Sequence, residues 1–284
     1  MKILLLGAGG MIGNGVYKIF SELGLHFIAT VSQDTRGMEL RSGQVEQFTI
    51  QNHPLQDATY LIQKFRPTHV VNCIGMIKPS DDLKTIKKLY NINSVFPQVL
   101  ARVCDTSGAR LIHMSTDCVF SGKRGNYTET DIPDDDSDYG KSKYLGEVTR
   151  RPHVTIRTSV IGRELHSQKN LLDWFLAVQD KQVSGYSSAL WNGVTSLCIG
   201  RVIARIIIDN LHFDAPVLQI TGDTLSKYEL LRLFQRVFGK DVHIVKKADY
   251  VSDKTLVPYT KQFAVFGDII PPIADQIREL KKYY

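Results

Sequence analysis

The sequence of 284 residues lacks the features that mark several classes of protein. It has only four cysteines, at positions 73, 104, 118 and 198, and none of them forms a CxxC pair. Such spacing supplies neither a disulfide framework nor a zinc site, so we expect free, mostly buried thiols in a reducing compartment. The eight histidines also show no ligand spacing, and we predict no metal site.

Long apolar runs and runs of like charge are also lacking. No segment approaches the roughly 18 consecutive apolar residues of a membrane span, and the apolar start ends at Gly7, too early for a signal peptide. We therefore expect a cytoplasmic protein without membrane contact. The net charge is +6, but the lysine pairs are scattered, so we expect no nucleic-acid partner. This mildly basic surface tolerates an anionic ligand.

Apolar strand-like runs alternate with helical spacing over the first part of the chain. This alternation predicts βαβ units and an α/β fold: a Rossmann-type, doubly wound parallel sheet with helices on both faces. The expected strands are Lys2–Leu6, His26–Val31, Val45–Ile50, His69–Cys73, Arg110–Met114 and His153–Thr158. The expected helices are Met11–Leu23, Ala58–Phe65, Leu83–Tyr90, Val95–Cys104 and Tyr139–Arg150.

Glycines cluster directly after the first expected strand. Gly7, Gly10 and Gly13 form a GxxGxxG pattern that includes Met11 and Ile12 and opens the first helix. Glycines so placed permit a tight turn and the close approach of a pyrophosphate to the helix N-terminus. We predict dinucleotide binding by these five residues. The alternative is an ordinary turn between a strand and a helix.

The end of the second strand indicates which dinucleotide binds. An acid there would hold the ribose of NAD, but this chain has Ser32 and Gln33, with no carboxylate until Asp34, and Arg36 and Arg41 follow. The missing acid and the arginines favour NADP(H), with NAD as the alternative; the arginines can also be solvated loop residues. We expect Ser32 and Arg36 to contact the cofactor. The fourth strand should add the small residues Cys73, Ile74 and Gly75.

After Val160 the strands and helices no longer alternate regularly. Helical spacing recurs at Asn170–Gln179, Thr195–Asn210 and Lys227–Phe238, and strand patterns at Pro216–Ile220 and Val242–Lys246. We predict a smaller α/β substrate lobe. The NADP-binding domain would then comprise residues 1–160 and 190–212, and a discontinuous substrate-binding lobe would comprise 161–189 and 213–284.

The segment from His113 to Glu147 holds the residues that indicate a reaction. Tyr139 and Lys143 are four residues apart at the start of an expected helix, so their side chains lie on one face. A neighbouring ammonium lowers the pKa of a phenol, which makes the pair a device for proton transfer. The alternative is an exposed pair without a function. Asn93 precedes an expected helix and can either hold a water in a proton relay or cap that helix.

Together these motifs resemble those of the extended short-chain dehydrogenases/reductases. The resemblance rests on the glycine turn, Asn93, Ser115-Thr116-Asp117, Val119-Phe120 and Tyr139-Gly-Lys-Ser-Lys143. Within that group the runs STDCVFSG, YTETDIP, YGKSKYLGE, RTSVIG and WNGVTS are similar to those of the dTDP-4-dehydrorhamnose reductases. The resemblance covers roughly residues 1–210 and is specific in the first lobe.

The resemblance implies a reaction and a set of roles. NADPH would deliver hydride to the 4-keto carbon of a nucleotide-linked 6-deoxyhexose, in the synthesis of cell-surface polysaccharide precursors. Tyr139 would protonate the carbonyl oxygen, Lys143 would lower the pKa of Tyr139 and hold the nicotinamide ribose, and Thr116 would bind the carbonyl, with Asn93 as a fourth catalytic residue. The expected substrate-binding residues are Ser115, Thr116, Asp117, Val160, Asn170 and Leu171. A homodimer is a further expectation.

The sequence also departs from the family pattern. Val160 and Ile161 stand where those reductases usually carry an aromatic pair near the sugar, which leaves the identity of the sugar open. Cys118 gives no second acid after Asp117, which disfavours dehydration. A sugar-nucleotide epimerase and a non-catalytic, NADP-binding regulatory subunit remain as alternatives. The acidic run Asp134–Asp138, which Ser137 interrupts, can be a solvated loop, a metal ligand set or a stabiliser of the helix that follows.

Overall fold

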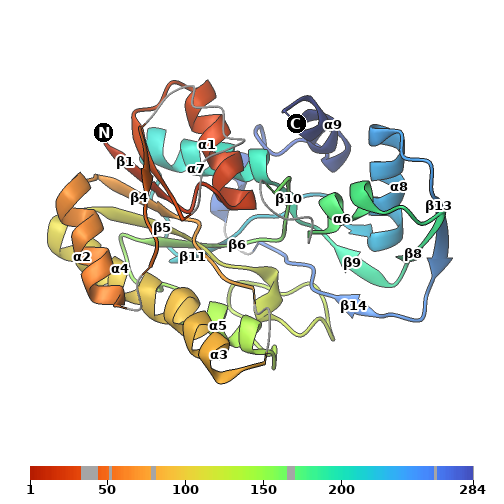
Figure 1. Ribbon diagram of the computed structural model, residues 1–284, viewed down its shortest axis with the longest axis horizontal. Helices are drawn as coiled ribbons and strands as arrows, with labels where there is room; N and C mark the ends of the chain where they lie inside the picture. The colour runs from red at the N-terminus through yellow and green to blue at the C-terminus, as the bar shows by residue number, and fades with distance from the viewer. Residues whose placement is uncertain (33–43, 51–52, 78–80, 165–169, 259–260, 284) are drawn as a thin grey trace.

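The structure is a computed structural model that describes residues 1–32, 44–50, 53–77, 81–164, 170–258 and 261–283. Its centre is a seven-stranded sheet in the order β11-β6-β5-β4-β1-β2-β3, with every neighbouring pair parallel. The strands are β1 (Ile3–Leu6), β2 (Phe27–Val31), β3 (Gln44–Gln47), β4 (His69–Asn72), β5 (Arg110–Met114), β6 (Val154–Arg157) and β11 (Val217–Gln219). The predicted doubly wound Rossmann-type fold is confirmed (Figure 1).

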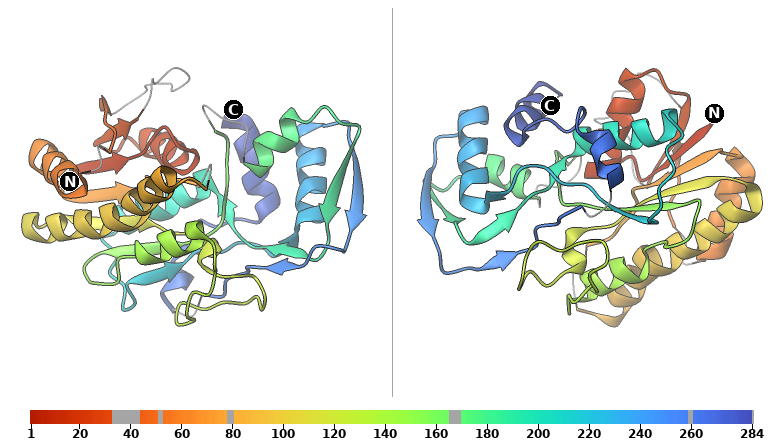
Figure 2. Two further views of the ribbon diagram at one scale, coloured as in Figure 1. Left: turned by 60° about the horizontal axis from the view of Figure 1, so that its bottom comes forward. Right: turned by 180° about the vertical axis from the view of Figure 1, so that it is seen from behind.

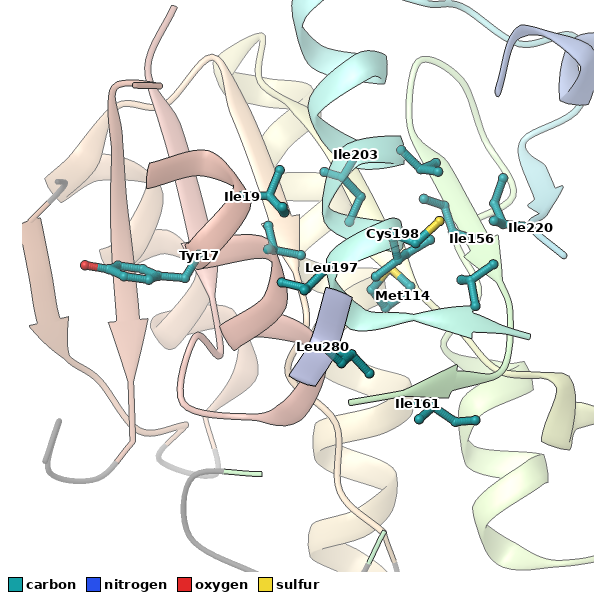
Figure 3. Packing of buried hydrophobic residues seen from close by; sticks show 14 of the residues in the cluster. Tyr17, Ile19, Met114, Ile156, Ile161, Leu197, Cys198, Ile203, Ile220 and Leu280 are labelled. Carbon is teal, nitrogen blue, oxygen red and sulfur yellow. The ribbon is translucent and has the colours of Figure 1, made fainter. Parts of the chain in front are cut away.

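Helices cover both faces of this sheet because its strands are apolar on both faces. Along β1, Ile3 and Leu5 pack in one core cluster, while Leu4 and Leu6 pack in another. The first cluster includes α1 (Met11–Glu22) and α7 (Ser196–Ile208), whose side chains interleave (Figure 3). The second includes α2 (Pro54–Phe65) and α4 (Phe96–Ser107). Strand β1 is therefore held from both sides, and its carboxyl end is fixed in place.

The order of the strands places a crevice beside β1. The chain runs from β1 outward to β2 and β3, and then returns to build the other half of the sheet from β4. At such a switch point, ligands of open α/β sheets bind beyond the carboxyl ends of the strands. The helices that follow these ends are α1, α3 (Leu83–Tyr90) and α5 (Asp138–Leu145).

A second, smaller lobe lies beside the sheet (Figure 2). It contains the parallel pair β8 (Gln182–Tyr186) and β13 (His243–Lys247), and the sheet β12-β9-β14, formed by Leu225–Ser226, Ala189–Trp191 and Ser252–Asp253. Its helices are α6 (Leu171–Ala177) and α8 (Lys227–Phe238). Strands β7 (Val160–Ile161) and β10 (Val194–Thr195) pair where the chain passes between the lobes, and α9 (Ile273–Tyr283) packs on α8, α7 and β10. No helix among the described residues is long and apolar enough to cross a bilayer.

Two expected elements differ clearly from those observed, and one observed turn was not expected. The strand expected at Pro216–Ile220 was assigned to the substrate lobe, but β11 pairs with β6 at the edge of the large sheet, because the chain leaving α7 is already packed on that sheet. The helix expected to reach Arg150 ends at Leu145. Gly146 caps it and lies so close to Asn93 that an added Cβ would fall 1.8 Å from the Asn93 carbonyl oxygen. Finally, a π-helical turn, Asn91–Val95, joins α3 directly to α4.

The crossing of α1 and α7 is closer than ordinary side chains allow. A Cβ at Gly15 would lie 2.4 Å from the Ser196 carbonyl oxygen, and one at Gly200 would lie 3.1 Å from the Gly15 carbonyl oxygen. We predict that Gly15→Ala lowers the free energy of unfolding by about 2 kcal/mol, because backbone atoms must move apart.

Urea denaturation followed by circular dichroism measures this effect. The matched control is Gly267→Ala, because a Cβ there would meet only the Ala264 carbonyl oxygen, at 3.5 Å. Equal stability of the two variants would contradict the prediction.

Candidate active site

The glycine turn has the shape that its sequence predicts. Gly7 ends β1 with φ +80°, and Gly10 is the N-cap of α1. A Cβ at Gly13 would lie 2.1 Å from the Gly7 carbonyl oxygen, so the helix can start this close to the strand only with glycine at that position. Gly7, Gly9 and Gly10 line the crevice, whereas Met11, Ile12 and Gly13 are not among its lining residues. The first N–H groups of a helix have no partner within the helix. The turn thus fits a pyrophosphate, which needs close backbone approach at a helix N-terminus.

A cavity of about 680 Å³ lies at the switch point, next to the glycine turn. Six of the residues predicted to bind the cofactor line it: Gly7, Gly10, Ser32, Cys73, Ile74 and Gly75. It also contains Phe48, Thr49 and Lys88, which the sequence did not single out; an aromatic residue just after a short strand was the available signal. Arg36 and Arg41 lie outside the described residues.

Thr116 and Tyr139 meet at the end of β5. Thr116 is the N-cap of a short 3-10 turn, Asp117–Val119, and its hydroxyl accepts a hydrogen bond from the backbone N–H of Cys118 at 3.1 Å. Burial raises the pKa of Tyr139 above its usual value, and the nearby Cys118 and Asp117 add to this rise, while a hydrogen bond with Thr116 opposes it. The phenol is therefore protonated at neutral pH, which is the form that can give a proton.

Lys143 lies in the same site but contacts a different group than expected. Its ammonium donates a hydrogen bond to the Met114 carbonyl oxygen at 2.6 Å. Burial lowers the pKa of Lys143 to about 8, against the charges of Glu147 and Cys73. The pKa of Tyr139 responds to burial, Cys118, Thr116 and Asp117. The lowering of this pKa by Lys143 stays a prediction.

Asn93 joins the cofactor cavity to the helix of Tyr139. Its side-chain oxygen accepts from the Met76 N–H at 2.8 Å, and its nitrogen donates to the Met76 carbonyl oxygen at 2.8 Å and to Ser142 at 3.0 Å. A Cβ at Gly75 would lie 3.8 Å from the Asn93 side-chain oxygen and 3.9 Å from the Lys143 ammonium. Asn93 is thus a clamp between the loop after β4 and α5, and Lys143 reaches the cavity beside Gly75.

Ser115 belongs to a buried ion network. Its hydroxyl donates to Glu147 at 2.7 Å, and Glu147 accepts two hydrogen bonds of 2.7 Å from Arg157. The guanidinium also lies over the ring of Phe120, 5.2 Å from its centroid. The Ser115 hydroxyl thus supports the pair that ties the end of β5 to β6, and its predicted contact with substrate stays a prediction.

The second lobe contributes two lysines that the sequence did not single out. Lys227, at the first turn of α8, lies over the ring of Trp191 at 5.8 Å from its centroid, and burial lowers its pKa against the charges of Asp117 and Cys118. Lys254 lies near the same two residues and pairs with Asp135 at 3.2 Å. Asp117 thus faces cations from the second lobe. Only the fold reveals this, because more than 100 residues separate them along the chain.

The remaining expected substrate residues serve the local fold of the second lobe. Asn170 is the N-cap of α6: its side chain accepts from the Asp173 N–H at 2.9 Å and donates to the Asp173 carboxylate at 2.7 Å, next to Leu171. Val160 pairs with Val194 in the strand that leads to Gly162, where a Cβ would lie 2.9 Å from the side chain of Met11. Among the described residues, no hydrogen bond joins Asn170 to Thr116 or Tyr139, so its role with substrate stays a prediction.

We predict that Lys143 makes stability depend on pH in the alkaline range. Its pKa is lowered on folding, from 10.5 to about 8, so the unfolded chain binds more protons than the folded one between these values. The free energy of unfolding should therefore rise with pH in this window by roughly 3 kcal/mol. Lys143→Met should remove this rise, as measured by urea denaturation at pH 7.5 to 10.5. If the free energy of unfolding rose equally with pH in the wild-type protein and in Lys143→Met, the prediction would be contradicted.

Comparisons with known proteins agree with this site. The family model for the RmlD substrate binding domain matches residues 1–184. The chain is 30% identical over 146 residues to methionine adenosyltransferase 2 subunit beta of Rattus norvegicus, covering 51% of this chain and 41% of that protein. It is 29% identical over 185 residues to spore coat polysaccharide biosynthesis protein SpsK of Bacillus subtilis (strain 168), covering 63% of this chain and 59% of that protein.

The chain therefore spans about two-fifths to three-fifths of the length of these curated relatives. The crystal structure of a dTDP-4-dehydrorhamnose reductase from Bacillus anthracis str. Ames in complex with NADP aligns with a TM-score of 0.76 and 16% identity, covering 100% of this chain and 99% of that one. This likeness shows a common fold. Since the family match includes the glycine turn, Thr116, Tyr139 and Lys143, this chain belongs to the RmlD substrate binding domain family.

Proposed function

We propose that this protein uses NADPH to reduce the 4-keto group of a nucleotide-activated 6-deoxyhexose. The observation that carries the proposal is that Tyr139 lies close enough to Thr116 for the threonine side chain to influence its pKa, while Lys143 lies next to Gly75 at the cavity of the glycine turn. A ketone reductase needs a hydroxyl pair to receive the carbonyl and a nearby place for a dinucleotide. Membership of the RmlD family and the printed names of SpsK and of the NADP-bound reductase support this choice.

The residues present can bind the cofactor. The N–H groups at the start of α1 would hold its pyrophosphate, Ser32 and Thr49 a ribose, and Lys143 the ribose beside Gly75. The bound NADPH supplies the hydride. We propose NADPH over NAD because Ser32 and Gln33 follow Val31 in the sequence, with no carboxylate until Asp34. Arg36, beyond that point, remains the sequence candidate for its phosphate.

The chain's own residues supply binding and the proton. Tyr139, protonated through burial, would donate its proton to the carbonyl oxygen as negative charge develops there. Thr116 would share that oxygen and hold it beside the phenol. The ammonium of Lys143 would favour the resulting phenolate once it turns from Met114 toward the cofactor ribose. The substrate lobe of residues 161–189 and 213–284, less strand β11, would hold the nucleotide sugar opposite this site.

We predict that Tyr139→Phe lowers kcat for NADPH oxidation at least 100-fold, because the proton donor is lost while the ring is kept. The assay follows the loss of NADPH absorbance, with dTDP- and UDP-linked 4-keto-6-deoxyhexoses as substrates. The dissociation constant for NADPH, measured by fluorescence, should stay within about twofold. Thr116→Ser is the matched control and should keep most of the activity. No turnover by the wild-type protein with any sugar nucleotide would overturn the proposed function.

A second candidate function is that of a regulatory subunit. It is favoured by the 30% identity to a protein named as a subunit of methionine adenosyltransferase 2. A regulatory role would depend on a partner complex and not on Tyr139. If Tyr139→Phe left the biological output unchanged while the partner stayed bound, this second candidate would replace the first.

A further inference from the structure

The second lobe is attached to the loop that separates Thr116 from Tyr139. The backbone N–H of Asp253, in β14, donates to the Gly122 carbonyl oxygen at 2.8 Å. Further along both segments, the Tyr127 N–H donates to the Thr255 carbonyl oxygen at 2.9 Å, and the Val257 N–H donates to the Tyr127 carbonyl oxygen at 2.8 Å. The short sheet β12-β9-β14 is therefore joined by backbone hydrogen bonds to the loop after Asp117, and not only packed near it.

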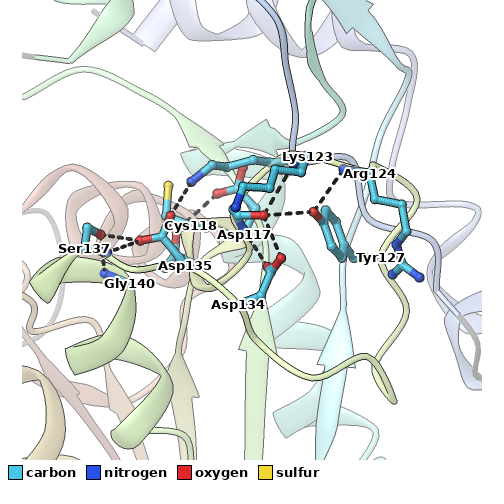
Figure 4. Close-up of polar contacts among 12 residues, drawn as sticks. Asp117, Cys118, Lys123, Arg124, Tyr127, Asp134, Asp135, Ser137 and Gly140 are labelled. Atoms are coloured by element: carbon cyan, nitrogen blue, oxygen red, sulfur yellow. Dashed lines mark hydrogen bonds and ion pairs between the residues drawn. The ribbon is translucent and has the colours of Figure 1, made fainter.

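Lys254 extends this attachment to the helix of Tyr139. Its ammonium is 3.2 Å from one carboxylate oxygen of Asp135. The other oxygen of Asp135 accepts from the Ser137 N–H at 2.9 Å and from the Ser137 hydroxyl. Ser137 is the N-cap of α5, and its hydroxyl accepts from the Gly140 N–H at 3.0 Å. Figure 4 shows Asp135 and Ser137 beside Gly140. A chain of polar contacts thus leads from the second lobe to the turn that carries Tyr139.

This contact chain has little room to adjust. A Cβ at Gly140 would lie 2.4 Å from Asp135 and 2.5 Å from the Cys118 carbonyl oxygen, so the first turn of α5 is pressed against both. The Asp135 N–H also donates to the Val119 carbonyl oxygen at 3.1 Å. A displaced Asp135 would therefore move the N-terminus of α5 relative to the turn that begins at Thr116.

The ion pair is sheltered enough to affect this geometry. The side chains of Lys254 and Asp135 are 23% and 14% exposed. Pairs on an open surface contribute little, whereas partly desolvated pairs that also hold backbone groups are stronger and more directional. Asp135 receives hydrogen bonds from Ser137 as well as the cation, so losing the cation would leave a partly buried carboxylate free to reorient.

We propose that Lys254 is a positioning residue, through which the second lobe sets the place of Tyr139 relative to Thr116 by way of Asp135 and Ser137. The inference rests on the proposed reductase function. It means that the Rossmann domain alone does not hold the proton donor Tyr139 in its working position. Lys254 does not itself contact the reacting atoms in this role. The opposing view is that Lys254 contributes only to the general stability of the chain.

Kinetics separate these two roles. Lys254→Met should lower kcat by about 10-fold or more, because small misplacements of a catalytic group are costly, while the dissociation constant for NADPH stays unchanged. Lys254→Arg, which keeps the charge, should recover most of kcat. Lys247→Met, an exposed lysine of β13 in the same lobe, is the matched control and should behave as wild type. Wild-type kcat in Lys254→Met would overturn the inference.

Hydrogen exchange tests the inference without relying on activity. Exchange of the Gly140 amide should be faster in both Lys254→Met and Asp135→Asn, while amides of β5 keep their protection. The double variant should resemble either single variant, because both changes break one path. Unchanged exchange at Gly140, or faster exchange spread over the whole chain, would overturn the positioning role. If the wild-type protein turns over no substrate but exchange changes as expected, the proposed function fails and the structural coupling stands.

Discussion

The buried pair of Glu147 and Arg157 is the interaction on which the site most depends. It connects the end of β6 to the segment directly after α5, and through Ser115 it also holds the end of β5. Both partners are almost fully buried, so removing either would strand a charge in the core. Thr116 follows Ser115, and Lys143, in the last turn of α5, precedes Glu147 by four residues. The same pair therefore sets the spacing between the threonine and the helix that carries Tyr139 and Lys143.

Much of the fold could be predicted because its signals are local. Apolar runs such as LeuLeuLeu after Ile3 are buried on both faces, and the glycine turn follows from backbone sterics at Gly7 and Gly13. The strand expected at Pro216–Ile220 was assigned to the substrate lobe, but it joins the large sheet as β11, because periodicity does not tell which sheet edge a strand joins. The early end of α5 was missed for a related reason. Only the distant Asn93 carbonyl oxygen shows why Gly146 must end it.

The candidate site divides in the same way. Thr116, Tyr139, Lys143 and the glycine turn were found because each lies within a motif of adjacent residues. Lys227 and Lys254 were missed because no motif precedes them; they reach Asp117 only through the pairing of β9 with β12 and β14. The protonation state of Lys143 also could not be predicted from the sequence. Helical spacing places Lys143 near Tyr139, yet its ammonium binds the carbonyl oxygen of Met114 and its pKa falls to about 8.

The π-helical turn at Asn91–Val95 has a consequence for the long helical segment from Leu83 to Ser107. Each residue in an α-helix advances the side chains by about 100°, so the wider turn changes the phase between the two ends. Before it, α3 has one buried residue, Leu89; after it, α4 buries Leu100, Ala101 and Cys104. The turn also directs Asn93 inward, toward Ser142. Shortening the segment by one residue would return it to a uniform helix and rotate either Asn93 out of the site or the core face of α4 into solvent. The number of residues between Leu83 and Ser107 is thus fixed by the need to keep both Asn93 and the core face of α4 pointing inward, whatever residues fill the exposed positions.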